Sequence, residues 1–235
     1  MRLPRDVGVV VVAAGQGLRA GGGAPKQFRP IAGVPMLLRA LRPFTAHPDV
    51  AQVVVVLPAD IVAAPPDWLA ELGGGMLTCV AGGEERTDSV RNGITALRAE
   101  CTMVLVHDGA RPFIERALID RVIARARGGA GVVPALMVSD TLKKVTGTSA
   151  EVAETVSRDG LYRAQTPQAF PVAMLHKAFA ARTSPGYVPT DEASLVEATN
   201  SGVVVLVEGS ALNLKITTPD DFVLAEAIAA QSTSS

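Results

Sequence analysis

The chain has 235 residues and is 48% hydrophobic, which is enough for one large α/β domain, over residues 1–235, with a substantial buried core. Its formal net charge of −1 disfavours a nucleic-acid-binding protein, which normally presents a basic face. Its apolar runs fall short of the about 20 residues that a membrane helix needs. The two cysteines, Cys79 and Cys101, provide no disulfide framework or metal cluster and fit a cytoplasmic location.

A buried strand followed by a glycine-rich loop is the first predicted feature. The β-branched run at 7–12 is typical of a strand that is buried on both faces, and residues 13–28 after it include few large side chains. Such a loop lets backbone N–H groups approach an anion closely, and Arg19 and Lys26 add two cations to it. Small residues that admit a polyphosphate, together with cations that hold it, predict a nucleotide site.

Two better-known glycine motifs fit this loop less well. The spacing from Gly15 to Ala20 matches the dinucleotide-binding fingerprint, but the glycines at 21–23 and Pro25 forbid the helix that should follow. No acidic residue stands about 20 positions later, where that fingerprint requires one. A Walker loop is disfavoured because Lys26 neither follows a glycine nor precedes serine or threonine. A purely structural turn stays open, although it would not need the two cations.

Strands and helices then alternate along the chain. Predicted strands lie at 53–57, 76–81, 103–107 and 130–135. Predicted helices lie at 35–43, with Pro43 ending or kinking the helix, at 67–72, at 88–97, with Asp88 or Ser89 as the N-cap, and at 115–127. The alternation predicts a three-layer, Rossmann-like α/β fold with a mostly parallel sheet and helices on both faces. Ligands of such sheets bind beyond the carboxyl ends of the strands, where Gly15, Gly83 and Asp108 fall.

The regular alternation stops at residues 138–168. Polar-alternating runs at 141–145 and 152–156 flank Gly147 and predict a β-hairpin that protrudes as an arm. A hairpin alone is marginally stable, so we expect the arm to pack on a second copy of the chain in a homodimer. After the arm we expect helices at 171–181 and 190–202, strands at 203–207 and 213–216, and a terminal helix from Thr218.

Charged residues beside the predicted strand ends are the candidates for chemistry. Asp108 faces the glycine loop and is placed to help hold Mg²⁺, which takes one or two carboxylates plus substrate phosphates; a simple turn aspartate is an equal alternative. His107 is interpreted as a strand histidine with satisfied hydrogen bonds rather than as a base. Arg111, Arg158 and Lys215 stand alone in the sequence, as surface charges usually do.

Eight blocks of the sequence form a larger pattern. They are Ala13-Ala14-Gly15-x-Gly17-x-Arg19 with Pro25-Lys26-Gln27, Gly82-Gly83-x-x-Arg86-x-x-Ser89-Val90, Val106-His107-Asp108-x-Ala110-Arg111-Pro112, Asp140-Thr141, Arg158, Thr166-Pro167-Gln168, Thr190-Asp191-Glu192-Ala193 and Asn213-x-Lys215-x-Thr217. In this order and spacing the pattern resembles the 2-C-methyl-D-erythritol 4-phosphate cytidylyltransferase family. The resemblance extends over nearly the whole chain and is far more specific than the glycine loop alone.

The resemblance implies a nucleotidyltransferase fold and a reaction between CTP and 2-C-methyl-D-erythritol 4-phosphate. The products would be 4-diphosphocytidyl-2-C-methyl-D-erythritol and pyrophosphate, in the non-mevalonate isoprenoid pathway. It also implies Mg²⁺ and a homodimer joined by the arm. A cytidylyltransferase for ribitol 5-phosphate or a related polyol phosphate is the nearest alternative, because it would differ only around the acceptor. A sugar-1-phosphate nucleotidyltransferase leaves the arm unexplained, and a nucleotide sensor without turnover leaves the pair of cations unexplained.

The resemblance also implies roles for individual residues. The catalytic candidates are Arg19 and Lys26, which would bind the triphosphate and stabilise charge at the α-phosphorus, and Arg158 and Lys215, which would hold the attacking phosphate. Candidates for nucleotide binding are Ala13, Ala14, Gly15, Gly83, Glu84, Ser89, Gly109 and Asp108, with Asp108 also beside the metal. Candidates around the acceptor are Arg111 and Thr190 and, from the partner's arm, Thr141 with Arg158. The sequence departs from the family pattern at Glu84, where Asp is common, and at Gly109, where Ala is common.

Overall fold

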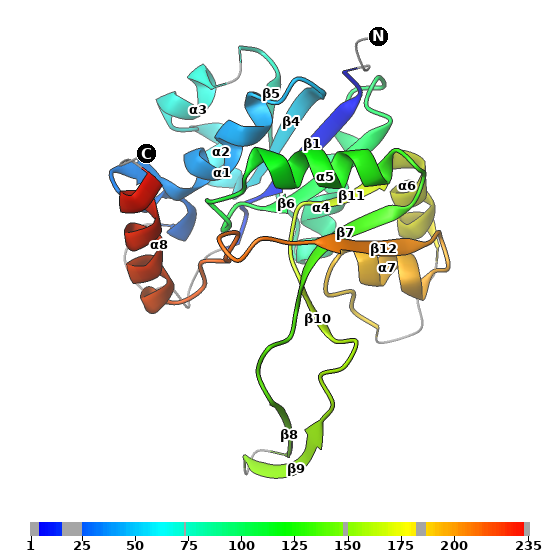
Figure 1. Cartoon of the computed structure of the whole chain (residues 1–235). Coiled ribbons are helices and arrows are strands. Elements are labelled where there is room, and N and C mark those ends of the chain that lie inside the picture. Colours follow the sequence, from blue (N-terminus) through cyan, green and yellow to red (C-terminus); the bar gives the residue numbers. More distant parts are fainter. Residues whose placement is uncertain (1–4, 16–24, 73, 148–149, 182–186, 233–235) are drawn as a thin grey trace.

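The computed structural model describes residues 5–15, 25–72, 74–147, 150–181 and 187–232, which form a layered α/β domain with one projecting arm (Figure 1). The central sheet of this described part runs in the order β10-β7-β11-β6-β1-β4-β5, with β12 paired to β7. Its strands are β1 (Val7–Val12), β4 (Val50–Leu57), β5 (Leu77–Ala81), β6 (Met103–Asp108), β7 (Gly131–Met137), β10 (Tyr162–Ala164), β11 (Gln168–Pro171) and β12 (Val204–Glu208).

Parallel pairing dominates the central sheet, as the sequence predicts. The neighbours β5, β4, β1 and β6 are parallel to one another, and β12 runs parallel to β7. The exceptions are β10 and β11, which pair antiparallel with their neighbours β6 and β7. The sequence does not predict these two strands, because runs of three or four residues are too short to show a periodic pattern.

Helices cover both faces of the sheet, and β1 shows why. Val9 and Val11 belong to the apolar cluster beneath α1 (Met36–Thr45) and α5 (Arg116–Ala126). Val10 belongs to the cluster on the other face, beneath α4 (Arg86–Thr95), α6 (Val172–Ala180) and α7 (Glu192–Ala198). The continuous β-branched run is therefore buried on both sides. The helices are α1 (Met36–Thr45), α2 (Ala59–Ala63), α3 (Asp67–Glu71), α4 (Arg86–Thr95), α5 (Arg116–Ala126), α6 (Val172–Ala180), α7 (Glu192–Ala198), α8 (Pro219–Ser232) and the 3₁₀ turn η2 (Lys26–Phe28). None of the helices in the described ranges is long and apolar enough to cross a membrane.

Two helix boundaries differ from the prediction. Glu85, rather than Asp88 or Ser89, is the N-cap of α4, and Asp88 completes a capping box with it as the third residue of the helix. Glutamate is a rarer cap than aspartate or serine, so the sequence favours the wrong residue. Pro43 lies inside α1 rather than at its end, since one missing N–H close to the C-terminus removes few helical hydrogen bonds.

The segment at 213–216 is predicted as a strand but forms a loop. Its anchors are the N–H of Ile216, which donates to the Ala110 carbonyl (2.8 Å), and the side-chain amide of Asn213, which donates to the Thr166 carbonyl (2.8 Å). Both side chains are fully buried. The alternating pattern therefore reflects two buried side chains of a pinned loop rather than a strand ladder. A small hairpin of β2 (Pro30–Ile31) and β3 (Val34–Pro35) lies in the chain between the end of the glycine loop and α1.

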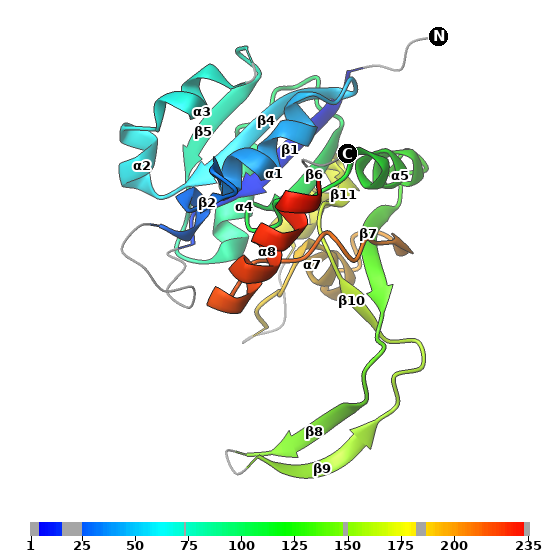
Figure 2. The ribbon, with the colours of Figure 1, turned by 60° about the vertical axis from the view of Figure 1, so that its left-hand side comes forward.

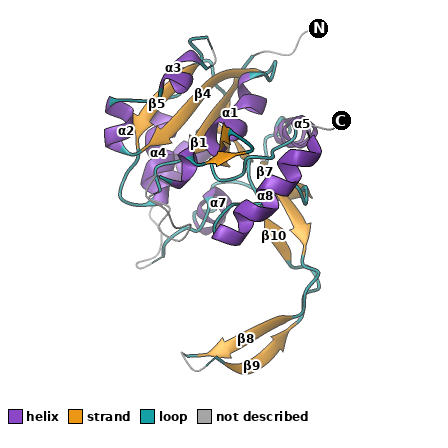
Figure 3. Cartoon of the chain, turned by 90° about the vertical axis from the view of Figure 1, so that its left-hand side faces the viewer, coloured by secondary structure: helices purple, strands orange, loops and turns teal. Residues whose placement is uncertain are grey.

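The predicted arm is a hairpin of β8 (Leu142–Thr146) and β9 (Glu151–Val156), which pair only with each other among the described strands. Gly147 and Ala150 adopt positive φ values of 54° and 56° at its turn. Figures 2 and 3 show the hairpin standing well away from the domain. The chain is back in the central sheet at Tyr162, opposite Met137, so the projecting part ends before residue 162 rather than at 168.

Candidate active site

A cavity of about 530 Å³ opens at the carboxyl edge of the sheet, where β1 and β6 end and α4 begins. Ten of the predicted site residues line it, namely Ala13, Ala14, Gly15, Lys26, Gly83, Glu84, Ser89, Asp108, Gly109 and Lys215. The cavity has seven further lining residues to which the sequence assigns no site role, although four of them stand in the eight sequence blocks. Those four are Gln27, Arg86, Ala110 and Thr217, and the others are Val12, Met36 and Glu85. The strand-end argument therefore finds the place of the cavity and most of its wall.

One wall of the cavity is a backbone turn after β5 that only glycine permits. A Cβ on Gly82 would lie 2.4 Å from the Cβ of Ala14, and one on Gly83 would lie 2.3 Å from the Cβ of Asp88. The N–H of Gly83 donates to the hydroxyl oxygen of Ser89 (3.1 Å), which is itself buried. The turn is thus packed against the end of β1 and fixed by the first turn of α4, which makes this wall of the cavity rigid.

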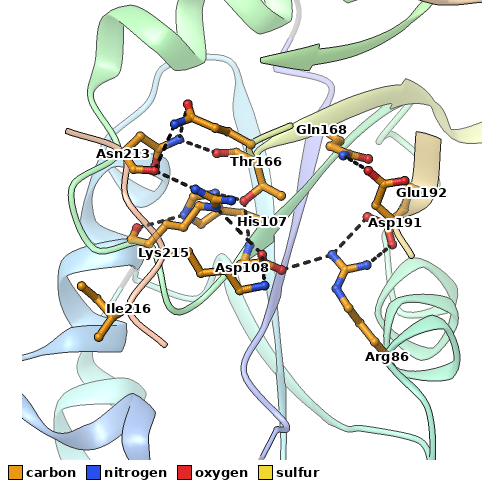
Figure 4. Close-up of polar contacts among 12 residues, drawn as sticks. Arg86, His107, Asp108, Thr166, Gln168, Asp191, Glu192, Asn213, Lys215 and Ile216 are labelled. Atoms are coloured by element: carbon orange, nitrogen blue, oxygen red, sulfur yellow. Dashed lines mark hydrogen bonds and ion pairs between the residues drawn. The ribbon is translucent and has the colours of Figure 1, made fainter. Parts of the chain in front are cut away.

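Asp108 forms the floor of the cavity and is surrounded by cations (Figure 4). Its carboxylate accepts from Lys215 Nζ at 2.8 Å and from Arg86 Nη2 at 3.2 Å, and Arg111 Nε lies 3.9 Å away. Burial alone would raise the pKa of Asp108, but the charges of Arg86, Lys215 and Arg111 outweigh it and hold that pKa well below its usual range. Asp108 is therefore a permanent anion at the centre of the site.

A buried histidine supports the backbone beneath Asp108. The hydroxyl of Thr166 accepts from the N–H of Asp108 (3.0 Å) and donates to Nδ1 of His107 (3.1 Å), so Nε2–H of His107 donates to the Arg111 carbonyl (3.2 Å). Burial lowers the pKa of His107 to about 4, so the ring is neutral near pH 7. The interpretation of His107 as a strand histidine with satisfied hydrogen bonds is confirmed; it is not a candidate base.

Arg86 joins this floor to a second buried carboxylate. Its guanidinium donates to both oxygens of Glu192, at 2.6 and 3.2 Å, while it also contacts Asp108. Burial raises the pKa of Glu192, and the charge of Arg86 opposes that rise. Arg86 and Glu192 both stand in the sequence blocks at 82–90 and 190–193, but only the fold brings these blocks together, so the pairing could not be predicted from the chain alone.

Lys26 and Lys215 flank the cavity on its other side. Lys26 Nζ donates to the Ile216 carbonyl (2.6 Å), which ties the end of the glycine loop to the loop that carries Lys215. Lys215 leaves nearly half of its side chain exposed, at 43%, even though it contacts Asp108. Both amines can therefore reach a ligand in the cavity without leaving their loops.

The remaining predicted residues lie outside the cavity wall or outside the described residues. Arg19 falls among the residues that the structure does not describe. Arg111 is buried and donates to the Asn213 carbonyl (2.7 Å). Thr190 is exposed just before α7, with its N–H donating to the Ser194 hydroxyl (3.1 Å). Thr141 and Arg158 are exposed on the arm, where Arg158 donates to the Ser139 carbonyl.

A mostly parallel sheet whose carboxyl edge carries a small-residue loop, two lysines and a buried carboxylate is the architecture of a nucleotidyltransferase. The sequence allows a narrower assignment. The chain belongs to the 2-C-methyl-D-erythritol 4-phosphate cytidylyltransferase family, whose sequence profile matches residues 7–231.

Individual relatives agree with this family. The 2-C-methyl-D-erythritol 4-phosphate cytidylyltransferase of Ralstonia nicotianae is 43% identical over 94% of this chain and 90% of that protein. The crystal structure of the Thermus thermophilus enzyme of the same name matches with a TM-score of 0.77 and 36% identity, over 94% of this chain and 98% of that one. The bifunctional enzyme IspD/IspF of Rhodospirillum rubrum is 45% identical over 94% of this chain, which spans only 56% of that protein. The family makes this chain a CTP-dependent cytidylyltransferase of isoprenoid biosynthesis.

Proposed function

We propose that the cavity binds CTP and brings it to 2-C-methyl-D-erythritol 4-phosphate, with the glycine turn at 82–83 and Ser89 against the nucleoside. Lys26, with Arg19 from the same loop, holds the triphosphate. Lys215 holds the phosphate of the acceptor. The observation that carries the proposal is that Lys26 and Lys215 line the same cavity as the buried Asp108, with Lys215 Nζ 2.8 Å from its carboxylate.

The chemistry follows from the charges. An oxygen of the acceptor phosphate attacks the α-phosphorus of CTP, a new P–O bond forms, and the bond to the β-phosphate oxygen breaks with its electron pair leaving on pyrophosphate. The attacking oxygen is already deprotonated, so no general base is needed. The obstacle is repulsion between two anions. The positive charges of Lys26, Arg19 and Lys215 lower this repulsion, and the same side chains hold the two phosphates in line. A neutral, buried His107 suits this reaction, because it takes no part in proton transfer.

Mg²⁺ belongs to the same proposal. No three His, Cys, Asp or Glu side chains gather into a metal cluster in the described part of the chain. Of the three carboxylates that line the cavity, Glu84 and Glu85 are exposed and Asp108 is buried. Asp108 fits the way Mg²⁺ binds nucleotides, in which one or two carboxylates act together with substrate phosphates. When bound, the ion would neutralise phosphate charge at the α-phosphorus. The protein's part would be to keep Asp108 ionised, and its three cationic neighbours do so.

We further propose a homodimer in which the arm of each chain completes the site of the other. The arm leaves Val145 and Val152 about half exposed, at 49% and 59%, and at its base Met137 is 66% exposed. Apolar side chains in these positions favour cover by another protein surface. Thr141 and Arg158 lie on this arm and do not line the cavity of their own chain. A second copy is therefore the economical source of the acceptor-binding arginine.

A cytoplasmic location is the last part of the proposal. The two free cysteines, Cys79 and the buried Cys101, are what a reducing compartment permits.

Pyrophosphate release from CTP tests the proposed function directly. We expect turnover with 2-C-methyl-D-erythritol 4-phosphate and Mg²⁺, and little with ribitol 5-phosphate at equal concentration. Purine triphosphates should be poor donors, because a pocket built to hydrogen-bond cytosine leaves its polar groups unpaired with another base. Preference for ribitol 5-phosphate would move the assignment to the alternative acceptor, and equal use of ATP would refute the nucleoside pocket.

A further inference from the structure

The first turn of α7 is bound to the floor of the cavity by two separate clamps. Arg86 of α4 takes both oxygens of Glu192 in a bidentate pair, at 2.6 and 3.2 Å. Gln168 of β11 donates to the Asp191 carboxylate (2.7 Å) and accepts from the N–H of Ala193 (3.1 Å). Figure 4 shows both clamps beside Asp108. Three elements that are distant in the sequence are therefore fixed to one another at the substrate side of the sheet.

Arg86 contacts Glu192 of α7 and Asp108 of the cavity floor at the same time. The same Nη2 that lies 3.2 Å from Glu192 also lies 3.2 Å from Asp108. Glu192 is only 3% exposed, so it needs this counter-charge to remain ionised. Arg86 is 31% exposed and lines the cavity, yet its guanidinium is turned toward carboxylates of its own chain.

We propose that Arg86 and Glu192 are positioning residues of the transfer reaction, with Glu192 holding Arg86 so that Asp108 is shared between Arg86 and Lys215. The inference rests on the proposed roles of Asp108 and Lys215. Neither Arg86 nor Glu192 needs to touch a substrate. Their task is to set the place of Asp108, and through it the place of the Lys215 amine, before the substrates arrive.

The charges show why Glu192 matters for Asp108. Two carboxylates, Glu192 and Asp108, compete for one guanidinium, while Lys215 competes with Arg86 for Asp108. Without Glu192, the full charge of Arg86 would act on Asp108 and draw it away from Lys215. The planar fork of arginine can serve both carboxylates at once, which a lysine amine in its place could not do with the same geometry.

The test separates positioning from simple stability by means of a double variant. Arg86→Met, Glu192→Met and Arg86→Met/Glu192→Met are compared in the full chain by Tm and by kcat and KM for both substrates. Arg86→Met leaves the buried charge of Glu192 unpaired and should lower Tm, whereas Glu192→Met leaves Arg86 paired with Asp108 and should lower Tm less. The double variant leaves no such charge at Glu192, so its Tm should return toward wild type while kcat stays at least about 10-fold low. Recovery of kcat together with Tm would overturn the proposal.

A milder variant covers the case in which the single methionine variants do not fold. Glu192→Gln keeps the shape and can still accept from Arg86, but it removes the charge. We expect its kcat to fall by about 10-fold with little change in Tm. Wild-type kcat in Glu192→Gln would also overturn the proposal.

Two controls complete the design. Arg127 bridges Asp6 (3.1 Å) and Asp49 (3.2 Å) beside the starts of β1 and β4, at the opposite edge of the sheet, so Arg127→Met should lower Tm and leave kcat unchanged. Lys215→Ala tests the underlying function. Wild-type turnover in Lys215→Ala would refute the proposed roles at this site, whereas low turnover there with wild-type kcat in the double variant would refute only the positioning role.

Discussion

The floor of the cavity and the arm both carry charged pairs, but they hold them in opposite ways. On the floor, Arg86 and Glu192 meet at 2.6 Å with 31% and 3% of their side chains exposed. On the arm, Lys144 and Glu154 meet at 3.0 Å with 68% and 56% exposed. The exposed pair contributes little, because solvent screens it, whereas the buried pair cannot lose a partner without a large penalty.

The difference shows which of the two regions finds partners for its charged groups within one chain. The floor is complete within one chain, since Asp108 and Glu192 both find cations there. The arm gives its apolar side chains and Arg158 no packed environment among the described residues of its own chain. We infer that the floor acts on substrate in its own chain and that the arm acts in the site of a second copy.

The largest expected effect belongs to the cavity cations. Lys26→Ala should fold normally and lose about 100- to 1000-fold in kcat, because it removes a charge directed at the transition state; Arg19→Ala should behave alike. Steady-state kinetics and circular dichroism measure the two properties. Lys177→Ala, which removes an exposed lysine from α6, is the matched control and should keep full activity. A near-normal kcat in either cavity variant would remove that residue from the proposed mechanism.

The second prediction tests the arm by subunit mixing. Arg158→Ala should be inactive by itself if Arg158 holds the acceptor phosphate. Mixing it with inactive Lys26→Ala gives dimers in which one site inherits both defects and the other inherits neither. With free exchange half of the dimers are mixed, so activity should recover to about a quarter of wild type.

The alternative gives a clear contrast. If Arg158 serves its own chain, both sites of the mixed dimer carry a defect, and mixing restores nothing. Native mass spectrometry of a tagged subunit shows whether exchange has occurred. No recovery with exchange complete would end the idea that the arm acts in trans.

The third prediction concerns the glycine turn at 82–83, which we propose lies against the nucleoside. In Gly83→Ala the new Cβ would meet the Cβ of Asp88 at 2.3 Å and its backbone carbon at 3.3 Å, so the start of α4 must shift. We expect kcat/KM for CTP to fall by about 10- to 100-fold. In Gly128→Ala the new Cβ has only ordinary contacts, at 3.4 Å or more, so that variant should keep its activity. Equal kinetics in the two variants would show that the turn does not shape the site.

The sequence predicts the parts of this molecule that depend on local pattern. The buried run of β1 and the strand ends at Gly83 and Asp108 are enough to place the cavity at the carboxyl edge. The hairpin arm is likewise visible in the alternation around Gly147. These features follow from periodicity and turn chemistry, which a single sequence displays.

The parts that depend on long-range pairing could not be predicted. Arg86 and Glu192 each stand at the start of a helix, where charged residues are common. Their ion pair joins positions that are 106 residues apart, so only the fold reveals it. The segment at 213–216 alternates like a strand because Asn213 and Ile216 are buried, although no strand pairs with it in the described residues. The antiparallel strand β11 is too short to show a periodic pattern of hydrophobic residues. Its Gln168 nevertheless fixes the start of α7 by donating to the Asp191 carboxylate.

The smallest expected effect is on stability and belongs to His107, beneath the floor. Its pKa is lowered by burial from 6.5 to about 4, so the unfolded chain binds a proton more readily between these values. The stabilisation is therefore complete above pH 6.5 and is lost as the pH falls toward 4. Between pH 7 and 5.5 the expected loss is about 1 kcal/mol in the free energy of unfolding. Urea unfolding at the two pH values measures it.

His107→Asn should be less stable throughout but should lose this pH dependence, whereas His176→Asn, on the exposed face of α6, should keep it. An unchanged pH dependence in His107→Asn would mean that burial does not lower the pKa of His107, and the ring would then not be a neutral support beneath Asp108.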